Sequence, residues 1–209
     1  MSPSSLMLRR LRVMRNGVPV YDEKFHRGLN IIRGENGSGK STISDFIFYV
    51  LGGEFDRWKP TARLCSEVQA EVETAGGVLT IKRPIGEKTT KPEVLFSTFD
   101  DAMSHGLDGW QRYPLHRQET QESFSQVIFR SSGIPEAISQ GTSNITMHQL
   151  LRLMYSDQRT APGFLFRYED WDNDLSPEFP PVLRRVLGLM FGLMRPAFPV
   201  PVWWRTRWA

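Results

Sequence analysis

Residues 34–41 read Gly-Glu-Asn-Gly-Ser-Gly-Lys-Ser, which is the Gly-x-x-x-x-Gly-Lys-Ser pattern of a P-loop. Glycines let the backbone curl so that successive N–H groups point inward and form a nest for an anion. A helix that begins directly afterwards adds the positive end of its dipole. In this pattern Lys40 reaches the β- and γ-phosphates of ATP and acts in catalysis, while the Ser41 hydroxyl binds Mg²⁺. The residues expected to hold the nucleotide are Gly34, Asn36, Gly37, Ser38, Gly39, Lys40, Ser41 and Thr42.

The sequence on either side of the P-loop predicts the strand and the helix that this motif requires. Residues 29–32 read Leu-Asn-Ile-Ile, a short, apolar and β-branched run that is typical of a buried strand. Between Lys40 and Leu51, apolar side chains recur at the spacing of one helix face, and Gly52-Gly53 then supplies a stop. We therefore expect an α/β fold of the P-loop NTPase class.

Alternating apolar residues predict antiparallel strand pairs on both sides of this unit. Asn16-Gly17 is a strong two-residue hairpin signal, and a second turn is expected at residues 75–77. A mixed or antiparallel sheet would then surround the P-loop helix, and residues 99–111 are expected to form a loop. The expected strands are residues 6–13, 18–25, 67–72, 78–83 and 94–96.

The second part of the chain is expected to be mostly helical. Residues 123–130 predict a short helix that Gly133 and the following residues close. Asn144 or Thr146 is a suitable N-cap for another helix, which would end near residues 155–158. Its apolar side is predicted to carry Leu150, Leu153 and Met154.

Composition and charge favour one soluble, cytoplasmic domain. The chain has 209 residues and a net charge of +3, but residues 179–209 hold five arginines and no acid, so the remainder has a net charge of −2. The body of the chain therefore lacks the positive surplus that is typical of nucleic-acid-binding domains. No apolar run reaches the roughly 18 residues that a membrane span requires, and the single Cys65 forms no internal disulfide.

Residues 29–42 resemble the N-terminal nucleotide loop of the structural-maintenance-of-chromosomes (SMC) and SbcC-type ATPases. The order of elements is similar as well, with a hairpin before the loop, a helix ending in Leu51-Gly52-Gly53, and a strand reading Leu-Thr-Ile-Lys-Arg at residues 79–83. The likeness covers residues 6–83 well and extends more loosely to residue 167. It implies the N-terminal lobe of an ABC-type ATPase head that hydrolyses ATP in DNA maintenance, such as double-strand-break repair.

The same resemblance implies further site residues and partners. ATP in such heads lies between two subunits, so a second ATPase head, identical or not, and DNA are expected partners. The family also has a Q-loop glutamine that helps to hold Mg²⁺ and the attacking water, and Gln158 resembles it. Gln149 and Gln126 are lesser candidates, and a plain surface glutamine is the alternative. Arg63 lies where related proteins carry a basic residue that contacts nucleotide or DNA, with a solvated surface arginine as the alternative, and Arg15 is a weaker candidate for the base or ribose.

Three elements that the family needs for hydrolysis are not found in this sequence: a Leu-Ser-Gly-Gly-like signature, an apolar strand ending in Asp-Glu, and a switch histidine. Residues 175–178 read Leu-Ser-Pro-Glu and resemble the signature only superficially, since Pro177 has no backbone N–H. We therefore expect one incomplete domain over residues 1–178 and a disordered tail over residues 179–209. A frameshift near Pro180 in the gene of a longer ATPase would explain this Arg-, Pro- and Trp-rich tail, and whether the chain hydrolyses ATP alone is left open.

Three other interpretations remain at this point. The chain could be a self-contained P-loop kinase for a small substrate, with Arg112, Arg117 and Arg130 as its lid. It could be a non-catalytic fragment that pairs with an intact ATPase. The tail could also be a basic, aromatic segment that binds nucleic acid or a membrane surface, although its prolines forbid one continuous amphipathic helix.

Overall fold

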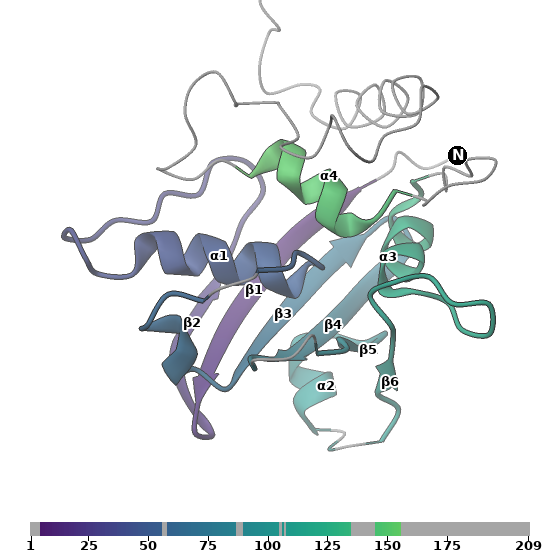
Figure 1. Ribbon diagram of the computed structural model, residues 1–209, viewed down its shortest axis with the longest axis horizontal. Coiled ribbons are helices and arrows are strands. Elements are labelled where there is room, and N and C mark those ends of the chain that lie inside the picture. Colours follow the sequence, from purple (N-terminus) through teal and green to yellow (C-terminus); the bar gives the residue numbers. More distant parts are fainter. Residues whose placement is uncertain are drawn as a thin grey trace, which may run out of the picture.

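Two β-hairpins, β2-β1 and β3-β4, lie side by side and form the first four strands of a six-stranded sheet, with β2 at its edge (Figure 1). The computed structural model describes residues 5–55, 58–86, 90–104, 106, 108–134 and 145–155. Among these residues all neighbouring strands are antiparallel, in the order β2-β1-β3-β4-β5-β6. The strands are β1 (Leu6–Arg15), β2 (Val18–Lys24), β3 (Glu67–Thr74), β4 (Gly77–Pro84), β5 (Glu93–Leu95) and β6 (Gln111–Arg112). The expected sheet around the P-loop helix is confirmed.

Both predicted hairpin turns form where the sequence places them. Asn16 and Gly17 adopt φ angles of 49° and 79°, as the two central residues of a type I′ turn require. Between β3 and β4, Gly77 has a φ angle of 124°, which a residue with a side chain would adopt only with strain. These two turns fix the registers of the hairpins on which the rest of the sheet is built.

The two faces of the sheet differ, because successive side chains of a strand point to opposite sides. One face is apolar and buried, and α1 (Lys40–Val50) lies across it (Figure 1). The helix ends at Val50 with Leu51 as its C-cap, and Gly52 follows with a φ angle of 108°, which confirms the predicted stop. The buried residues of this face are Leu11 and Val13 of β1, Val68, Ala70 and Val72 of β3, and Leu79 and Ile81 of β4.

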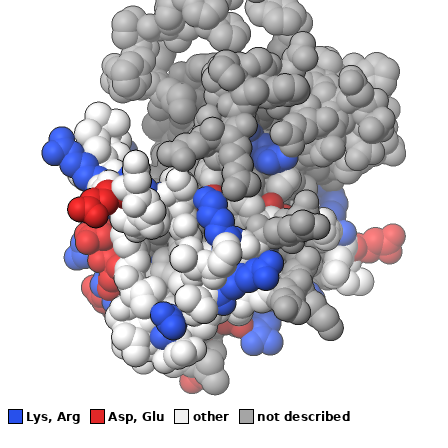
Figure 2. All heavy atoms as spheres, turned by 60° about the vertical axis from the view of Figure 1, so that its left-hand side comes forward, with Lys and Arg blue, Asp and Glu red and all other residues white. Residues whose placement is uncertain are grey.

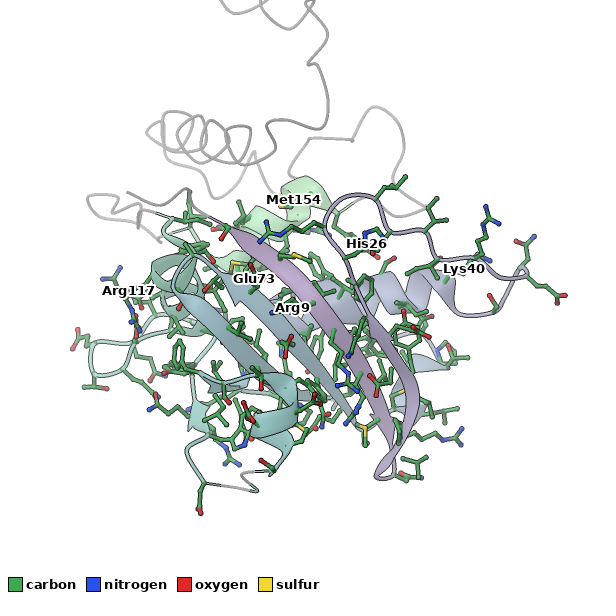
Figure 3. The ribbon with its side chains drawn as sticks, turned by 180° about the vertical axis from the view of Figure 1, so that it is seen from behind. Arg9, His26, Lys40, Glu73, Arg117 and Met154 are labelled. Atoms are coloured by element: carbon green, nitrogen blue, oxygen red, sulfur yellow. The ribbon has the colours of Figure 1, made fainter. Side chains whose placement is uncertain are left out.

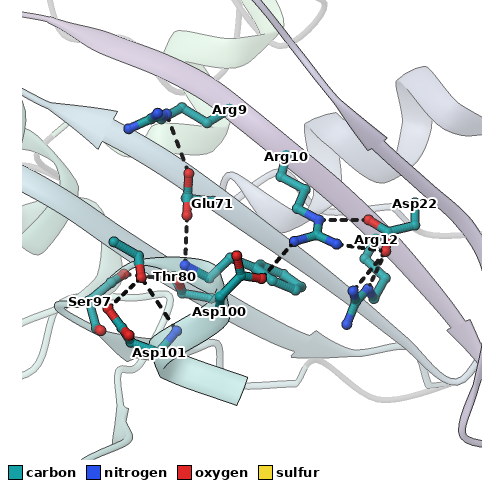
Figure 4. A network of polar contacts seen from close by, with 11 residues as sticks. Arg9, Arg10, Arg12, Asp22, Glu71, Thr80, Ser97, Asp100 and Asp101 are labelled. Carbon is teal, nitrogen blue, oxygen red and sulfur yellow. Dashed lines mark hydrogen bonds and ion pairs between the residues drawn. The ribbon is translucent and has the colours of Figure 1, made fainter. Parts of the chain in front are cut away.

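The opposite face is charged, and the short helix α2 (Phe99–Ser104) covers part of it (Figure 4). Phe99 is 1% exposed, because the guanidinium groups of Arg10 and Arg12 lie over its ring, 4.4 and 4.6 Å from the ring centroid. The carboxylate of Asp22 accepts hydrogen bonds from both arginines, at 2.7 Å from Arg10 Nε and 2.8 Å from Arg12 Nε. The hydrogen bond from Arg10 lowers the pKa of the Asp22 carboxyl below its ordinary value.

α2 shows that the expectation of a loop over residues 99–111 is wrong for the first part of that stretch. The Thr98 hydroxyl accepts a hydrogen bond from the N–H of Asp101 at 3.4 Å and donates one to the Asp101 carboxylate at 2.6 Å. The Thr98 side chain therefore caps the N-terminus of α2, and a threonine at this position is a start signal for a helix. The cap and the burial of Phe99 outweigh the turn-forming residues that follow.

The expected strand at residues 29–32 is absent from the structure, and this prediction is wrong. Leu29 is 75% exposed and Ile31 is 66% exposed, and the segment pairs with no described strand. A strand needs a neighbour for its backbone groups, whereas here the Asn30 side chain turns the segment back on itself. Asn30 Oδ1 accepts from the N–H of His26 at 3.1 Å, and Asn30 Nδ2 donates to the His26 carbonyl oxygen at 2.8 Å.

α3 (Phe124–Ser132) and α4 (Met147–Met154) confirm the two helices predicted for the second part of the chain. Each begins with a capping box, formed by Ser123 and by Thr146. In α4 the buried residues are Met147, Leu150 and Leu151. Met154 was expected on the buried side, but it is the last residue of α4 and is 51% exposed; the Leu153 side chain is outside the described part.

In the described part of the chain, no helix has both the length and the apolar character that crossing a membrane would demand. The end of the expected domain 1–178 and the whole tail 179–209 lie outside the described residues.

Candidate nucleotide site

The P-loop takes the glycine conformations that its sequence predicts. Gly37 and Gly39 have φ angles of 84° and 92°, and the space beside each of them, where a side chain would begin, is open. Gly34 has no positive φ angle, but a Cβ atom there would come within 2.5 Å of Ser38 Oγ, so the Ser38 hydroxyl would have to turn away. Gly37 and Gly39 therefore permit the backbone path, and Gly34 leaves room for the Ser38 side chain.

The N-terminus of α1 is left free for an anion. Gly39 is its N-cap, no side chain caps it, and no acidic residue lies in its first turn. The first N–H groups of a helix have no carbonyl partner within the helix. Here those of Lys40, Ser41 and Thr42 have no backbone partner elsewhere in the described residues either, and the first helical bond runs from Ile43 N to Gly39 O at 3.0 Å. A phosphate group would satisfy these N–H groups and meet the positive end of the helix dipole.

Lys40 is folded onto the P-loop. Its Nζ donates hydrogen bonds of 2.7 Å to the carbonyl oxygens of Gly34 and Glu35. The ammonium group is thus held above the loop in which the glycine N–H groups lie, at one end of the molecule (Figure 3). A phosphate bound in the loop would lie within reach of this charge.

The residues that are present also fit a magnesium ion bound together with the nucleotide. Within the described ranges, no group of three or more His, Cys, Asp or Glu side chains could hold a metal ion. Mg²⁺ typically takes one or two protein oxygens and completes its shell with phosphate oxygens and water. The hydroxyl of Ser41, in the first turn of α1, is the oxygen that the P-loop pattern assigns to this role.

Gln158, the expected Q-loop residue, lies outside the described residues, so its predicted role is not tested. The side chains of the two lesser candidates, Gln126 and Gln149, form hydrogen bonds at the starts of helices. The side chain of Gln126 accepts from the N–H of Ser123 at 2.9 Å, and that of Gln149 accepts from the N–H of Thr146 at 2.9 Å. Both glutamines therefore hold the start of a helix, α3 and α4 respectively.

The other predicted basic residues lie at the surface. Arg63 is exposed in the short 3₁₀ helix η1 (Ala62–Leu64), and Arg15 is exposed at the end of β1. The three arginines proposed as a kinase lid are not gathered over the P-loop. Arg112 pairs with Glu93 at 2.6 Å and Arg130 pairs with Glu122 at 3.0 Å, while Arg117 and Lys40 lie at opposite ends of the molecule (Figure 3).

The surface beside the P-loop carries no continuous basic patch on the face that Figure 2 shows. The lysine and arginine side chains there are scattered among uncharged residues, and acidic side chains gather along one edge. This agrees with the charge balance of the sequence before residue 179.

Sequence reasoning missed one polar residue near the site. Asp45 lies on α1 and is only 6% exposed, with Lys59 Nζ 2.6 Å from its Oδ2 and the hydroxyl of Tyr155 hydrogen-bonded to its Oδ1. The available signal was an acidic residue between the apolar residues of an amphipathic helix, since such a residue becomes buried and needs partners.

A second buried polar group lies at the C-terminal end of α1. Arg83 of β4 is 1% exposed, and its Nη1 donates to the carbonyl oxygens of Tyr49 and Gly53 at 2.6 and 2.7 Å. Its guanidinium also lies over the Tyr49 ring, 3.8 Å from the centroid. Burial lowers the pKa of this arginine, and a positive charge at a helix C-terminus is favourable. Arg83 therefore anchors the P-loop helix to the sheet.

The P-loop, Asp45 and Arg83 lie within a region that matches a known protein family. A protein-family model described as an AAA domain matches residues 22–161. A comparison with curated proteins gives no match. Among solved structures, one SMC ATPase, described for its ATP-driven dimerisation and DNA-stimulated activation, is similar with 16% sequence identity and a TM-score of 0.40. That match covers 72% of this chain and 92% of the other, and nothing further about this chain follows from it.

Proposed function

The chain belongs to the AAA domain family, in agreement with its resemblance to SMC- and SbcC-type ATPases, and from this membership we propose that it binds Mg-ATP in the P-loop as one half of a composite ATPase site. The family supports an ATP-binding module. The observation that carries the proposal is the uncapped N-terminus of α1, where three N–H groups have no partner among the described residues and the Lys40 ammonium lies beside them.

Each residue of the P-loop has a separate task in this proposal. Gly37 and Gly39 turn backbone N–H groups toward the phosphates, and the first turn of α1 adds its own. Lys40 exchanges the carbonyl oxygens of Gly34 and Glu35 for β- and γ-phosphate oxygens, which bear more negative charge. Mg²⁺ would neutralise charge on the same phosphates, with Ser41 as its protein ligand. Gln158 is proposed as the residue that orients the attacking water.

The partner that completes the site is proposed from the exposure of the P-loop and from the family resemblance. Residues 33–38 are all exposed, so nothing in the described chain covers the γ-phosphate end of the site. The sequence contains no Leu-Ser-Gly-Gly-like motif. We propose that a second ATPase head supplies those groups, and that the chain alone binds nucleotide but turns it over slowly. DNA maintenance, such as double-strand-break repair, is proposed as the cellular process on the resemblance alone.

Isothermal titration of the purified chain with Mg-ATP tests the binding step. Wild type is expected to bind, and Lys40→Ala to bind at least about tenfold more weakly, because it loses charge-assisted hydrogen bonds to the phosphates. Lys91→Ala is the matched control, since Lys91 is an exposed lysine in the segment before β5 and belongs neither to the P-loop nor to α1. Equal affinities of Lys40→Ala and wild type would exclude the P-loop as the binding site.

A turnover assay on the same samples tests the composite site. The chain alone is expected to release phosphate slowly, and an intact homologous head is expected to bind it only when Mg-ATP is present, as seen by size-exclusion chromatography. Rapid steady-state hydrolysis by the purified chain would refute the proposal that a second head is needed.

A further inference from the structure

A buried carboxylate lies on the P-loop helix one turn beyond the proposed magnesium ligand. Asp45 follows Ser41 by four residues, so the two side chains share one face of α1. Burying a carboxylate costs free energy unless its oxygens are satisfied. Both oxygens of Asp45 have a partner: Oδ2 lies 2.6 Å from Lys59 Nζ, and Oδ1 accepts a hydrogen bond from the Tyr155 hydroxyl.

These partners come from segments far apart in the sequence. Lys59 follows Trp58, whose ring packs on Phe46 of α1 with centroids 5.6 Å apart. Tyr155 is the C-cap of α4, and its N–H donates to the Leu151 carbonyl oxygen at 2.8 Å. Asp45 is therefore the point at which the P-loop helix, the loop before η1 and the end of α4 meet.

Aromatic rings also pack both ends of α4 against α1, with His148 in the first turn of α4 and Tyr155 at its C-cap. The Tyr155 ring lies 5.0 Å from that of Phe48, and the His148 ring lies 5.6 Å from the same Phe48. These ring contacts tolerate small shifts, whereas hydrogen bonds have a fixed direction. His148 Nδ1 accepts one from the N–H of Glu54 at 3.0 Å, beyond the C-terminal end of α1. The hydrogen bond between Tyr155 and Asp45 relates the last turn of α4 to the turn of α1 that follows Ser41.

We propose that Asp45 is a positioning residue that couples the phosphate-binding loop to the end of α4. The inference rests on the proposed nucleotide binding. Phosphates held by the N–H groups of Lys40, Ser41 and Thr42 order the first turn of α1, and the next turn carries Asp45. Through Tyr155 that ordering reaches α4. Lys59 neutralises the Asp45 carboxylate, which would otherwise repel the phosphates one turn away.

Hydrogen exchange of the full chain with and without Mg-ATP tests the coupling. In wild type, Mg-ATP is expected to slow amide exchange in residues 147–155 about tenfold, the effect of stabilising one charge-assisted hydrogen bond. Tyr155→Phe removes only the hydroxyl and keeps the ring on Phe48. We expect this variant to bind Mg-ATP with an affinity within about threefold of wild type and to lose the nucleotide-dependent slowing.

Tyr49→Phe is the matched control, because it removes another tyrosine hydroxyl on α1, one that donates to the Pro84 carbonyl oxygen and not to Asp45. It is expected to keep the slowing. Asp45→Asn is a second variant that retains an acceptor oxygen but loses the ion pair with Lys59, and it is expected to lose at least half of the effect. A merely structural role of the contact would change exchange equally with and without nucleotide.

Two results would overturn the inference while leaving nucleotide binding intact: Lys40-dependent binding without slowed exchange in α4 of wild type, or full slowing in Tyr155→Phe. Loss of the slowing in Tyr49→Phe as well would also refute it, because the effect would then not pass through Asp45. Absence of Lys40-dependent binding in wild type would instead refute the proposed function, and the coupling with it.

Discussion

Replacing Arg83 with methionine tests whether a buried arginine holds the P-loop helix against the sheet. Methionine fills a similar volume but donates no hydrogen bond. The Gly53 carbonyl oxygen then loses the only donor described for it, whereas the Tyr49 carbonyl oxygen keeps the N–H of Gly52 at 3.0 Å. The variant therefore leaves one buried oxygen without a partner and weakens the bonding of a second.

The expected cost follows from these contacts. An unsatisfied buried carbonyl costs about 1–3 kcal/mol, the second lost hydrogen bond about 1 kcal/mol, and the lost cation–π contact with Tyr49 about 1–2 kcal/mol. Arg83 Nε has no hydrogen-bond partner among the described residues, and relief of the buried charge offsets part of the loss. We expect a net destabilisation of about 3 kcal/mol, which lowers the Tm of a chain of this size by roughly 6–12 °C.

Chemical denaturation followed by circular dichroism measures this difference. Lys82→Met is the matched control: Lys82 is the neighbouring residue in β4, points to the opposite face, and has its Nζ 3.8 Å from the centroid of Trp110. Its loss is expected to cost less than about 1 kcal/mol, as for exposed cation–π contacts. A free energy of unfolding for Arg83→Met within about 1 kcal/mol of wild type, or above it, would refute the anchoring role.

Two further predictions concern the P-loop and the charged face of the sheet. Gly39→Ala is expected to lose about 1–2 kcal/mol of stability and to bind Mg-ATP more weakly in calorimetry, because the φ angle of 92° strains any residue with a Cβ atom although the space is open; unchanged affinity would contradict the cradle geometry. The lowered pKa of Asp22 means that its stabilisation is fully present above the ordinary carboxyl pKa and is lost as the pH falls through the lower, folded-state value. Unfolding measured from pH 7 to pH 2 should therefore show a shallower loss of stability in Asp22→Asn than in wild type, and identical slopes would count against the ion pair with Arg10.

The sequence predicted those parts of the fold that short-range patterns determine. The two hairpins and the P-loop helix follow from turn residues and periodicity at Asn16-Gly17, residues 75–77 and residues 40–51. The strand at residues 29–32 was wrong because an apolar run specifies a strand only if a neighbour is present. α2 was missed because Gly and Asp were read as loop formers, although Thr98 and Asp101 already form a capping pattern.

The candidate site was predictable in part for a similar reason. The phosphate-binding residues are consecutive in the sequence, and a motif therefore identifies them. The roles of Asp45 and Arg83 depend on contacts with residues far away in the sequence: Tyr155 lies 110 residues from Asp45, and Tyr49 lies 34 residues from Arg83. No pattern in a single sequence reveals such pairings before the topology is known.

The strand order also determines when the nucleotide site can form during folding. Most neighbouring strands are joined by short connections, but β1 pairs with β3 across the segment that carries α1. Closing this long loop has a larger entropic cost than closing either hairpin, so the hairpins are expected to form first. The apolar face of β1, β3 and β4, on which the P-loop helix packs, is complete only after that closure. A nucleotide would then act on folding by slowing the reopening of the sheet, with little effect on the rate at which the hairpins first assemble.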